Sequence, residues 1–501
     1  MKKYFIFLFI SSLYSQNINL DSLYYSYNEI RDSLYAWQEK FGNDPHPFDY
    51  YSNSIIYHLD SIGVSSNENI PIYAVKLSIN ANIEENQPKV LLLGQCHAEE
   101  IYGLQMVMSL IEWFLYPENT PWANNELPMF LHNLEIWIVP THNPEGLNVV
   151  HGYEDESGNW IQDVSYRKNK TDVNMNGVFD FTSFYPTQIA GNDSDGVDLN
   201  RNYGLNWSFG DDKYELNLQS CGLNQAYSSN YDYYRGLYPF SEKEIQSIRD
   251  FVIEKNFLFS IAYHSSRSGC VSERVIYPWS WGWSDLNGNE IFDKEEAKKA
   301  SPDFTIIHDL ADNIASRIQK ESGGSYDRRP QKSRNGNAHD WIYSQTGCIQ
   351  FLVEVGSSNM QPLNQDLINT TIENNRKGLF YLLEESIPSE SNDVQHINGI
   401  VIDKQTGDPI EGAIYILHEF DSSILSKRKT NKDGYFHRVL PFGDYNIEFI
   451  AEGYQKVALV IGKDPLSIVE LMPLESKDFT ISFIEYEGYA SLTPINISLI
   501  D

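Results

Sequence analysis

Five apolar runs limit what this chain can fold into. In each run, mostly hydrophobic residues occupy consecutive positions over six to nine residues. Strands buried on both faces of a sheet have unbroken apolar sequences of this length, whereas strands with one wet face alternate. The chain is therefore predicted to contain a parallel or mixed sheet. Its strands are expected at residues 72–79, 89–94, 134–140, 257–264 and 348–356.

The segments between these runs have helical patterns. Residues 101–115 and 241–255 carry apolar side chains at helical spacing. Ser241, followed three positions later by Glu244, predicts a capping box at the start of the second helix. We therefore expect an α/β fold with a mixed, largely parallel central sheet flanked by helices.

The sequence pattern changes at residues 389–395, a polar stretch that is typical of a linker. We expect it to follow an α/β domain at 17–388. From 396 to 475, turn signals such as NKDGYF and PFGDY recur between alternating runs, which predicts a small antiparallel β-sandwich. Residues 476–501 are expected to form a β extension, to which we assign no role.

The first sixteen residues, MKKYFIFLFISSLYSQ, have the layout of a cleavable secretory signal. Two lysines precede a short apolar run, and small residues surround Ser15. The run is about half the roughly 20 apolar residues that a membrane-spanning helix needs, and no later stretch is long enough. We therefore expect a secreted protein, extracellular or periplasmic, without a membrane span.

The net charge of the chain limits the classes of partner that it can bind. The 501 residues carry a formal net charge of −32. Nucleic acids and anionic membranes both need a basic face on the protein that binds them. The composition therefore argues against both partners and favours an acidic, solvated surface.

The cysteines argue against cysteine-ligated zinc. Cys96, Cys221, Cys270 and Cys348 show no C-x-x-C spacing. In an oxidising compartment one or two disulfides can form, and the sequence leaves their pairing open.

Polar residues that can bind metal ions stand at the ends of three predicted strands. His97 and Glu100 follow the second run, His264 ends the fourth, and Glu354 lies within the fifth. Open α/β sheets build their sites at such strand ends. An isolated H-x-x-E pair is more often a surface feature, and an arginine can neutralise a buried Glu354. The alternative is a metal centre with a carboxylate that faces water at the metal.

Seven blocks follow one another in a recognisable order. They are His97-x-x-Glu100, PTHNPEG (140–146), YRKN (166–169), GVDLNRNY (196–203), YRGLYPFSEKE (234–244), His264 and FLVEVG (351–356). This order resembles the zinc metallocarboxypeptidase family, whose catalytic domain has the carboxypeptidase A-like fold. The resemblance covers roughly residues 22–385. The C-terminal sandwich is similar to the transthyretin-like, or carboxypeptidase regulatory-like, domain found in one branch of that family.

The resemblance implies one Zn²⁺ per chain, bound by His97, Glu100 and His264. Two histidines and one carboxylate leave a fourth position of zinc open for water, as in catalytic sites. The resemblance makes Glu354 the general base that takes a proton from zinc-activated water and then, as an acid, protonates the leaving amine.

The resemblance also implies how substrate is held. Arg167 would stabilise the oxyanion of the tetrahedral intermediate. Asn200 and Arg201 would bind the free carboxylate of the substrate, since a guanidinium can pair with a carboxylate through two hydrogen bonds. The implied protein is a secreted metallocarboxypeptidase, a monomer that hydrolyses the C-terminal peptide bond of peptides or proteins.

Two positions depart from the family pattern. The family usually has a tyrosine eight residues before the Asp of the D-W-x-Y element, Asp340 in this sequence, but Lys332 stands there. Either Tyr326 takes its place, or Lys332 helps to hold the substrate carboxylate. Glu99 stands where the family often has an arginine, so the outer substrate-binding positions are expected to differ.

The stretch that shapes the pocket for the terminal side chain reads KSRNGNAHD. His339 occupies a position at which family members vary their specificity, and no acidic residue stands there to favour basic termini. We expect a preference for polar or acidic C-terminal residues, with His339 or Arg334 as the contact.

Two stretches, 172–180 and 285–296, resemble calcium loops. Oxygen ligands at alternating positions can surround a cation that needs six or more of them. The alternative is a polar turn with Asx hydrogen bonds. The candidate ligands are Asp172, Asn174, Asn176 and Asp180 in the first loop, and Asp285, Asn287, Asn289, Asp293 and Glu296 in the second.

Two other functions remain open from the sequence. The same zinc site could serve an amidase or endopeptidase that acts on cell-wall peptides. A non-catalytic peptide-binding relative could keep the fold without turnover, although none of the expected zinc ligands is missing.

Overall fold

The computed structural model of the protein describes residues 19–20, 22–120, 125–179, 195–210, 233–266, 271–284, 286, 292, 294–462 and 468–474. Several predictions fall outside these described residues. They concern the signal at 1–16, the extension at 476–501, Cys221 and Cys270, and the candidate calcium ligands Asp180, Asp285, Asn287, Asn289 and Asp293.

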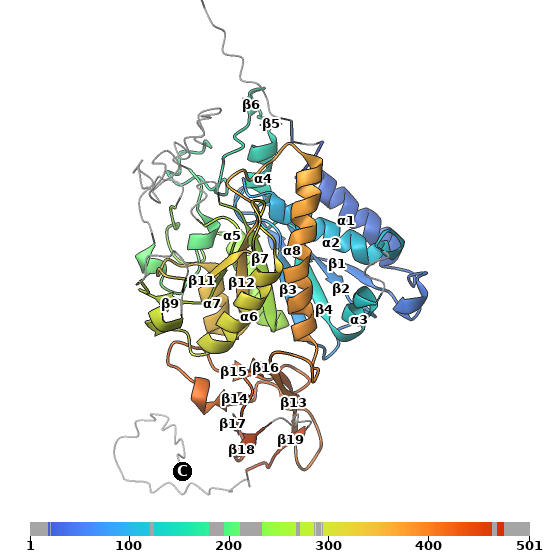
Figure 1. Cartoon of the computed structure of the whole chain (residues 1–501), viewed down its shortest axis with the longest axis vertical. Coiled ribbons are helices and arrows are strands. Elements are labelled where there is room, and N and C mark those ends of the chain that lie inside the picture. Colours follow the sequence, from blue (N-terminus) through green and yellow to red (C-terminus); the bar gives the residue numbers. More distant parts are fainter. Residues whose placement is uncertain are drawn as a thin grey trace, which may run out of the picture.

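An eight-stranded sheet forms the centre of the molecule (Figure 1). In spatial order, its strands are β1 (Tyr57–Val64), β2 (Pro71–Leu77), β4 (Glu135–Val139), β3 (Lys89–Leu93), β7 (Phe259–His264), β12 (Ile349–Glu354), β8 (Arg274–Tyr277) and β11 (Asp327–Pro330). The four middle strands β4, β3, β7 and β12 are parallel to one another. β8 is antiparallel to β12, and β11 is parallel to β8. The predicted mixed, largely parallel sheet is confirmed.

The five predicted strands form the buried part of this sheet. Every residue of β4, β7 and β12 is buried. Side chains alternate between two hydrophobic cores: Val90 and Leu92 of β3 pack into the larger core, and Leu91 and Leu93 pack into the smaller one. Because both faces are covered, apolar residues occupy most neighbouring positions of these strands.

Helices supply the second layer on both faces. The larger core contains residues of α1, α2, α3, α4, α6 and α8, and the smaller core contains residues of α5 and α7. Figure 1 shows α8 crossing in front of the sheet. The helices span Tyr27–Phe41 (α1), Tyr102–Leu115 (α2), Glu126–Asn133 (α3), Pro144–His151 (α4), Lys243–Lys255 (α5), Phe304–Arg317 (α6), Ala338–Thr346 (α7) and Gln365–Ser386 (α8).

The capping box predicted at Ser241 and Glu244 is wrong. Glu242 is the N-cap of α5 and makes no side-chain cap hydrogen bond. The Ser241 oxygen accepts from the Asn202 side-chain amide at 2.9 Å and its hydroxyl donates to the Glu242 carboxylate at 2.6 Å, so its contacts are with these side chains and not with the first turn of the helix. A capping box does form at α1, between Ser26 and Glu29.

A C-terminal β unit, residues 395–471, follows α8 and lies below the main sheet in Figure 1. Two small sheets, β16-β13-β19 and β15-β14-β17-β18, enclose a third hydrophobic core. Side chains of β13 alternate strictly between buried and half-buried, as expected of a strand with one covered face. The strands span Gln395–Asp403 (β13), Ile414–Leu417 (β14), Arg428–Lys429 (β15), Tyr435–Leu440 (β16), Tyr445–Ile450 (β17), Val457–Ile461 (β18) and Ile468–Leu471 (β19).

Buried charges join the C-terminal β unit to the rest of the protein. Asp303, just before α6, accepts hydrogen bonds from Arg438 at 2.5 Å, from Arg428 at 3.3 Å and from the Tyr343 hydroxyl at 2.6 Å. Burial raises the pKa of Asp303, but Arg438 and Arg428 outweigh it, and the net pKa is lowered. The carboxylate is therefore charged and fully paired within the protein.

The remaining short elements lie in the connections. They are the strand pairs β5 (Tyr153–Glu154) with β6 (Trp160–Ile161) and β9 (Ser280–Trp281) with β10 (Lys299–Ala300), and 3-10 helices at Asp49–Tyr51, Pro117–Asn119, Leu199–Arg201, Trp207–Phe209, Lys294–Glu296 and His418–Phe420.

Cys96 and Cys348 are buried free thiols, so the chain does not form two disulfides.

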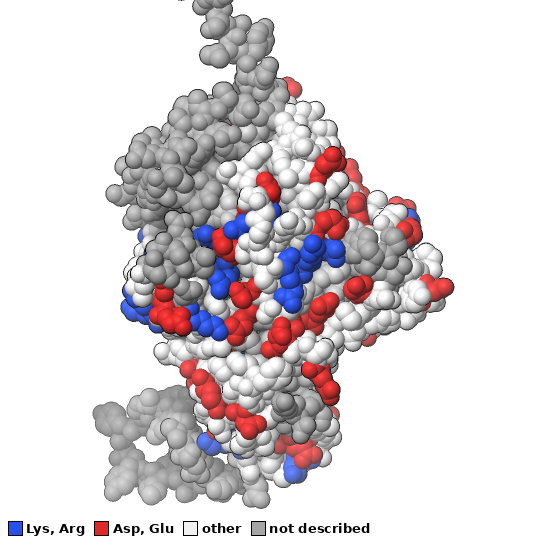
Figure 2. Space-filling model, in the orientation of Figure 1, with Lys and Arg blue, Asp and Glu red and all other residues white. Residues whose placement is uncertain are grey.

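Within the described residues, no helix combines the length and apolarity that crossing a bilayer requires. Figure 2 shows acidic side chains spread over the visible face, both on the main α/β part and on the C-terminal β unit.

Candidate metal centre and active site

Three neighbouring strands bring the predicted metal-binding residues together. β3 ends at Leu93, just before His97 and Glu100, and His264 is the last residue of β7. Glu354 is the last residue of β12 and pairs directly with His264 in the parallel register. Because these strands are parallel, their carboxyl ends lie at one edge of the sheet.

His97, Glu100 and His264 form a compact, buried cluster. The Nδ1 atom of His97 lies 2.9 Å from Glu100 Oε1 and 3.0 Å from His264 Nδ1. The Nδ1 atom of His264 lies 2.8 Å from Glu100 Oε2. One ligand atom from each residue lies within 4.8 Å of the others. Two imidazole nitrogens and a carboxylate oxygen that converge in this way fit Zn²⁺ with an open fourth position.

A second layer of contacts orients these ligands. Asp198 Oδ1 lies 3.2 Å from His97 Nε2, and the backbone N–H of Ser265 donates to Glu100 Oε2 at 3.1 Å. A carboxylate on the far nitrogen of a metal-binding histidine fixes its tautomer and ring orientation. Asp198 lies within the block GVDLNRNY, where its residue type and spacing alone indicate no role.

Glu354 lies beside the cluster as a buried carboxylate. It is 8% exposed, and its Oε2 atom has no hydrogen-bond partner among the described residues. Burial, and next the charge of Glu100, raise the pKa of Glu354 to about 8. An orphaned buried carboxylate oxygen next to a metal-binding cluster fits a group that exchanges a proton with a ligand.

Arg167 lies between several carboxylates. Its Nε donates to Asp198 at 3.1 Å, and its Nη1 donates to Glu100 at 3.1 Å and lies 3.8 Å from Glu99. Burial alone would lower the pKa of Arg167, but Asp198, Glu100 and Glu99 raise it well above its ordinary value. Arg167 is therefore a fixed positive charge beside the metal centre.

The ring of Tyr233 lies against two arginines of the site. The guanidinium carbon of Arg167 is 5.3 Å from the ring centroid, and that of Arg201 is 5.6 Å away. Both distances allow a cation–π contact. The sequence did not indicate a role for Tyr233, because this residue lies just outside the block that begins at residue 234.

Asn200 and Arg201 belong to the 3-10 helix Leu199–Arg201, which lies next to the start of α7. The Asn200 side-chain carbonyl accepts from the Ala338 N–H at 2.9 Å, and Arg201 Nη1 donates to the Asn200 backbone carbonyl at 2.8 Å. The NH₂ group of Asn200 is not used in holding the helix. The two predicted substrate-binding residues are thus neighbours in space as well as in sequence.

Tyr326 and Lys332 are the two candidates for the role of the missing family tyrosine. Tyr326 packs in the larger core, and its hydroxyl accepts from the Gly356 N–H at 3.0 Å. His264 and Glu354 project from the other face of the sheet, so the idea that Tyr326 takes the tyrosine's place is wrong. Lys332 is exposed, with its Nζ 5.1 Å from the ring centroid of Trp283.

His339 is buried in the first turn of α7. Neither of its ring nitrogens has a hydrogen-bond partner among the described residues. Burial, and then His264 and Arg201, lower the pKa of His339 to about 3. His339 is therefore a neutral imidazole with free polar atoms. Arg334, by contrast, lies over the rings of Trp281 and Phe209, at 4.7 and 5.6 Å.

The described part of the first candidate calcium loop forms Asx hydrogen bonds. The carboxylate of Asp172 accepts from the N–H groups of Asn176 and Gly177, at 3.2 and 2.7 Å. Asn174 also accepts from the Asn176 N–H at 3.0 Å. In the second loop, Glu296 accepts from the Leu286 N–H. This geometry suits the polar-turn alternative, and calcium stays a prediction.

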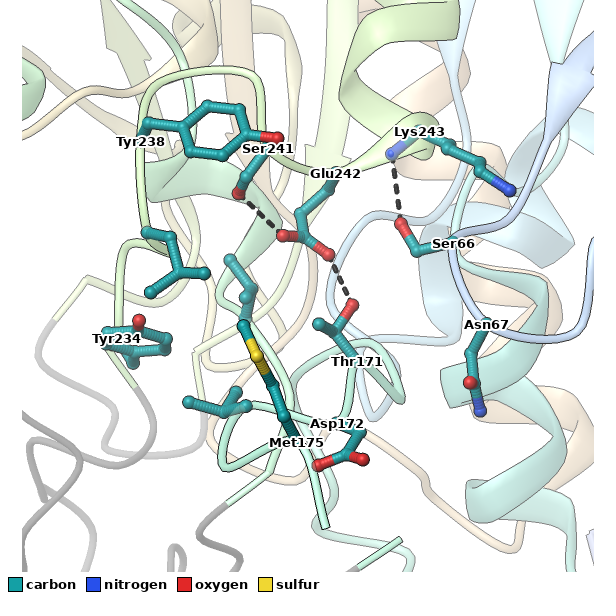
Figure 3. A pocket seen from close by; sticks show the side chains of 13 residues that line it. Ser66, Asn67, Thr171, Asp172, Met175, Tyr234, Tyr238, Ser241, Glu242 and Lys243 are labelled. Atoms are coloured by element: carbon teal, nitrogen blue, oxygen red, sulfur yellow. Dashed lines mark hydrogen bonds between the residues drawn. The ribbon is translucent and has the colours of Figure 1, made fainter. Parts of the chain in front are cut away.

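A pocket of about 330 Å³ is lined by side chains that include Thr171, Tyr234 and Glu242 (Figure 3). In the figure, Glu242 points between Ser241 and Thr171, which both donate to it, and the Lys243 N–H donates to Ser66 at 2.9 Å. The zinc-site residues are not among those that line this pocket. It is therefore separate from the metal centre.

A buried His-Glu-His cluster at the carboxyl ends of parallel strands, with an unpaired carboxylate and a fixed guanidinium beside it, defines a zinc hydrolase. A family model described as zinc carboxypeptidase matches residues 51–378, more than half of the chain. The chain therefore belongs to the zinc carboxypeptidase family.

Individual relatives agree with this assignment. Human carboxypeptidase D is 23% identical over 422 residues, which cover 80% of this chain but only 24% of that protein. Carboxypeptidase E of Caenorhabditis elegans is 24% identical over 404 residues, 74% of this chain and 71% of that protein. The crystal structure of thrombin activatable fibrinolysis inhibitor (TAFI) shares the fold, with a TM-score of 0.50 at 17% identity over 72% of this chain and 74% of that one.

Proposed function

We propose that the protein is a zinc-dependent carboxypeptidase that removes the C-terminal residue of peptides or proteins. The observation that carries the proposal is the placement of Glu354 next to the His97, Glu100 and His264 cluster, with Arg167 and other groups for an anionic substrate alongside. Family membership supports the same reaction.

The metal would be held by His97, Glu100 and His264. Bound zinc supplies a Lewis acid that lowers the pKa of water toward 7 and polarises the scissile carbonyl. Asp198 keeps the far nitrogen of His97 engaged, which leaves Nδ1 for the metal.

Glu354 is the proton carrier in this proposal. Its carboxylate takes a proton from the attacking water and passes it to the nitrogen of the leaving residue. Burial supports this role, because it raises the pKa of Glu354 above its ordinary value and so makes the carboxylate a better proton acceptor than an exposed glutamate. Arg167, fixed by Asp198, offers its N–H groups to the oxyanion that develops on the carbonyl.

Asn200 and Arg201 bind the terminal carboxylate of the substrate. The Asn200 carbonyl is occupied by the start of α7, so its NH₂ group is directed to a ligand. Lys332, which is exposed over the ring of Trp283, adds a positive charge for the same carboxylate in this proposal. His339 lines the pocket for the terminal side chain, where its neutral ring offers one donor and one acceptor.

The same proposal includes secretion as a monomer after removal of residues 1–16. N-terminal sequencing of the exported protein should begin after this signal, and sedimentation should give a single chain. The proposal also includes calcium binding by the two loops at 172–180 and 285–296. Calcium chelation should lower the melting temperature while zinc is retained if they bind the ion.

The activity test uses the purified mature protein and N-blocked dipeptides, with and without a zinc chelator. We expect release of single C-terminal residues that stops on chelation and returns with Zn²⁺. Glu354→Gln should lower kcat by about 10²–10⁴-fold, the usual contribution of a general base, and should still bind zinc. Glu39→Gln, an exposed change on α1, is the matched control. Zinc binding without any release would favour the amidase or the binding-protein alternative.

A further inference from the structure

Strand register places Arg329 on the same face of the sheet as the metal centre. Arg329 of β11 pairs with Ile276 of β8, and Ile276 pairs with Leu352 of β12. Residues that pair directly across a sheet point to the same side. Leu352 is two positions before Glu354, so it also points to the side of Glu354. Arg329 therefore belongs to the row next to the general base.

This face is the one that α7 covers. Ala338, Trp341 and Ile342 of α7 pack into the smaller core together with Ala262 of β7. Leu352 and Ile276 are each 5% exposed, yet neither belongs to the larger or the smaller core. The row of this face that contains Leu352 and Ile276 thus carries buried side chains that pack into neither core.

Arg329 differs from the other arginines of these two strands. Arg274 pairs with Asp327 at 3.5 Å, and Arg328 pairs with Asp312 at 2.5 Å. Among the described residues, no carboxylate lies within ion-pairing distance of Arg329. Its half-buried guanidinium is therefore unpaired.

The electrostatics agree with an unpaired cation. Burial, and next the charge of Arg274, lower the pKa of Arg329 to about 10, while Glu354 acts in the opposite direction. Arg329 remains charged at neutral pH. A desolvated guanidinium without a counter-ion is costly, and a carboxylate that binds it through two hydrogen bonds removes that cost.

We propose that Arg329 binds the side-chain carboxylate of the substrate's C-terminal residue, so that the enzyme prefers peptides ending in glutamate or aspartate. This inference rests on the proposed carboxypeptidase function. The main-chain groups of the substrate are bound by Arg167, Asn200 and Arg201. Arg329 is therefore available to bind a second negative charge, on the side chain of the terminal residue. Arg334 is not suited to this role, because it lies over Trp281 and Phe209.

The test compares N-blocked dipeptides that differ only in ending with Glu or Gln, two side chains of the same shape but different charge. We expect the wild-type kcat/KM to be about tenfold or more higher for Glu, since a site built for a polar group discriminates strongly against its absence. Arg329→Met should remove this ratio by lowering the value for Glu while changing that for Gln less than about threefold. Arg329→Glu should favour a Lys-ended substrate. Arg334→Met is the matched control and should keep the wild-type ratio.

Two results would overturn the inference. One is an equal rate with Glu and Gln in the wild type. The other is an Arg329→Met variant that loses activity equally on all substrates with a shifted pH profile, since that would make Arg329 a counter-ion of Glu354. Circular dichroism and zinc content show whether the variants are folded.

A binding measurement separates this inference from the proposed function. Calorimetry with zinc-loaded Glu354→Gln protein reports affinity without turnover. Tighter binding of the Glu-ended dipeptide than the Gln-ended one, lost on adding Arg329→Met, supports acidic recognition even if the wild type hydrolyses nothing. Equal affinity for the Glu-ended and the Gln-ended dipeptide would overturn the inference about Arg329. The carboxypeptidase function is tested separately, by whether the wild-type protein hydrolyses the dipeptides.

Discussion

Asp198 and Arg167 are joined by a hydrogen bond of 3.1 Å from the guanidinium Nε to one carboxylate oxygen, while the other oxygen lies 3.2 Å from Nε2 of His97. One buried carboxylate thus contacts both a proposed metal ligand, His97, and the arginine proposed to meet the oxyanion. Metal binding and oxyanion stabilisation should therefore weaken together when Asp198 is changed.

Asp198→Asn is expected to weaken zinc binding by about 10–100-fold, the usual effect of removing a partner of a metal-binding histidine. It should also lower kcat in fully zinc-loaded protein, because Arg167 loses a charged partner. Competition with a chromogenic chelator measures the first effect, and steady-state kinetics with excess zinc measures the second. Asp250→Asn, at an exposed Asp–Arg pair on α5, is the control. An unchanged zinc affinity would contradict the positioning role.

The ring of Tyr233 should hold Arg167 and Arg201 in place. Tyr233→Leu removes contacts that are worth about 0.5–2 kcal/mol, so kcat/KM should fall by roughly 2- to 30-fold. Tyr233→Phe keeps the ring and should retain most of the activity. If both variants lose the same activity, the hydroxyl rather than the ring is responsible.

Asp303 should control the attachment of the C-terminal β unit. Asp303→Asn leaves Arg428 and Arg438 buried without their counter-charge, which costs about 3–5 kcal/mol in comparable buried pairs. We expect a lower denaturant midpoint and faster proteolysis of residues 387–394, between α8 and β13. Asp421→Asn, at the exposed pair with Lys427, should change the free energy of unfolding by about 0–1 kcal/mol. Equal effects of the two variants would show that the buried cluster does not hold the unit.

Glu244 should make the protein less stable as the pH rises. Burial, and then Glu242 and Glu145, raise the pKa of Glu244 to about 8. The unfolded chain releases this proton at about pH 4.3, so between the two values the folded state holds the extra proton. Its contribution to stability is complete below the unfolded pKa and is lost as the pH rises through about 8, by up to about 1.4 kcal/mol per pH unit.

Glu244→Gln should therefore flatten the decline in unfolding free energy between pH 5 and 8 and stabilise the protein most at pH 8. Urea midpoints at several pH values measure this. Glu254→Gln, at an exposed position of the same helix, should leave the slope unchanged. A slope that persists in Glu244→Gln would assign the pH dependence to another group.

The sequence was most informative where burial is complete. β3, β4, β7 and β12 could be predicted because both of their faces are covered, so most of their residues are apolar. β8 and β11 were missed because they are short, lie toward one edge, and contain charged residues, as in DRRP at 327–330. Their pairing with β12, a long-range contact, makes them strands.

The same distinction holds for the site. His97, Glu100, His264 and Glu354 stand out as polar residues at the ends of apolar runs, but their proposed roles came from the resemblance of seven ordered blocks to a known family. Arg329 could not be predicted, since a charged tetrapeptide has the appearance of a loop until its register is known. Ser241 and Glu244 fit a capping pattern, but the Ser241 hydroxyl is bound to Glu242, a competition that spacing alone does not reveal.

The pairing of β12 with β7 has a consequence for the evolution of this chain. Side chains of a strand alternate between its faces, so a shift by one residue exchanges the two faces. Deleting any one residue of 349–353 with the strand's start held in place would leave Val355 opposite His264 and turn Glu354 toward the larger core. Such a deletion should abolish activity as completely as losing the glutamate, so the length of this strand should tolerate less variation than the identity of its apolar residues.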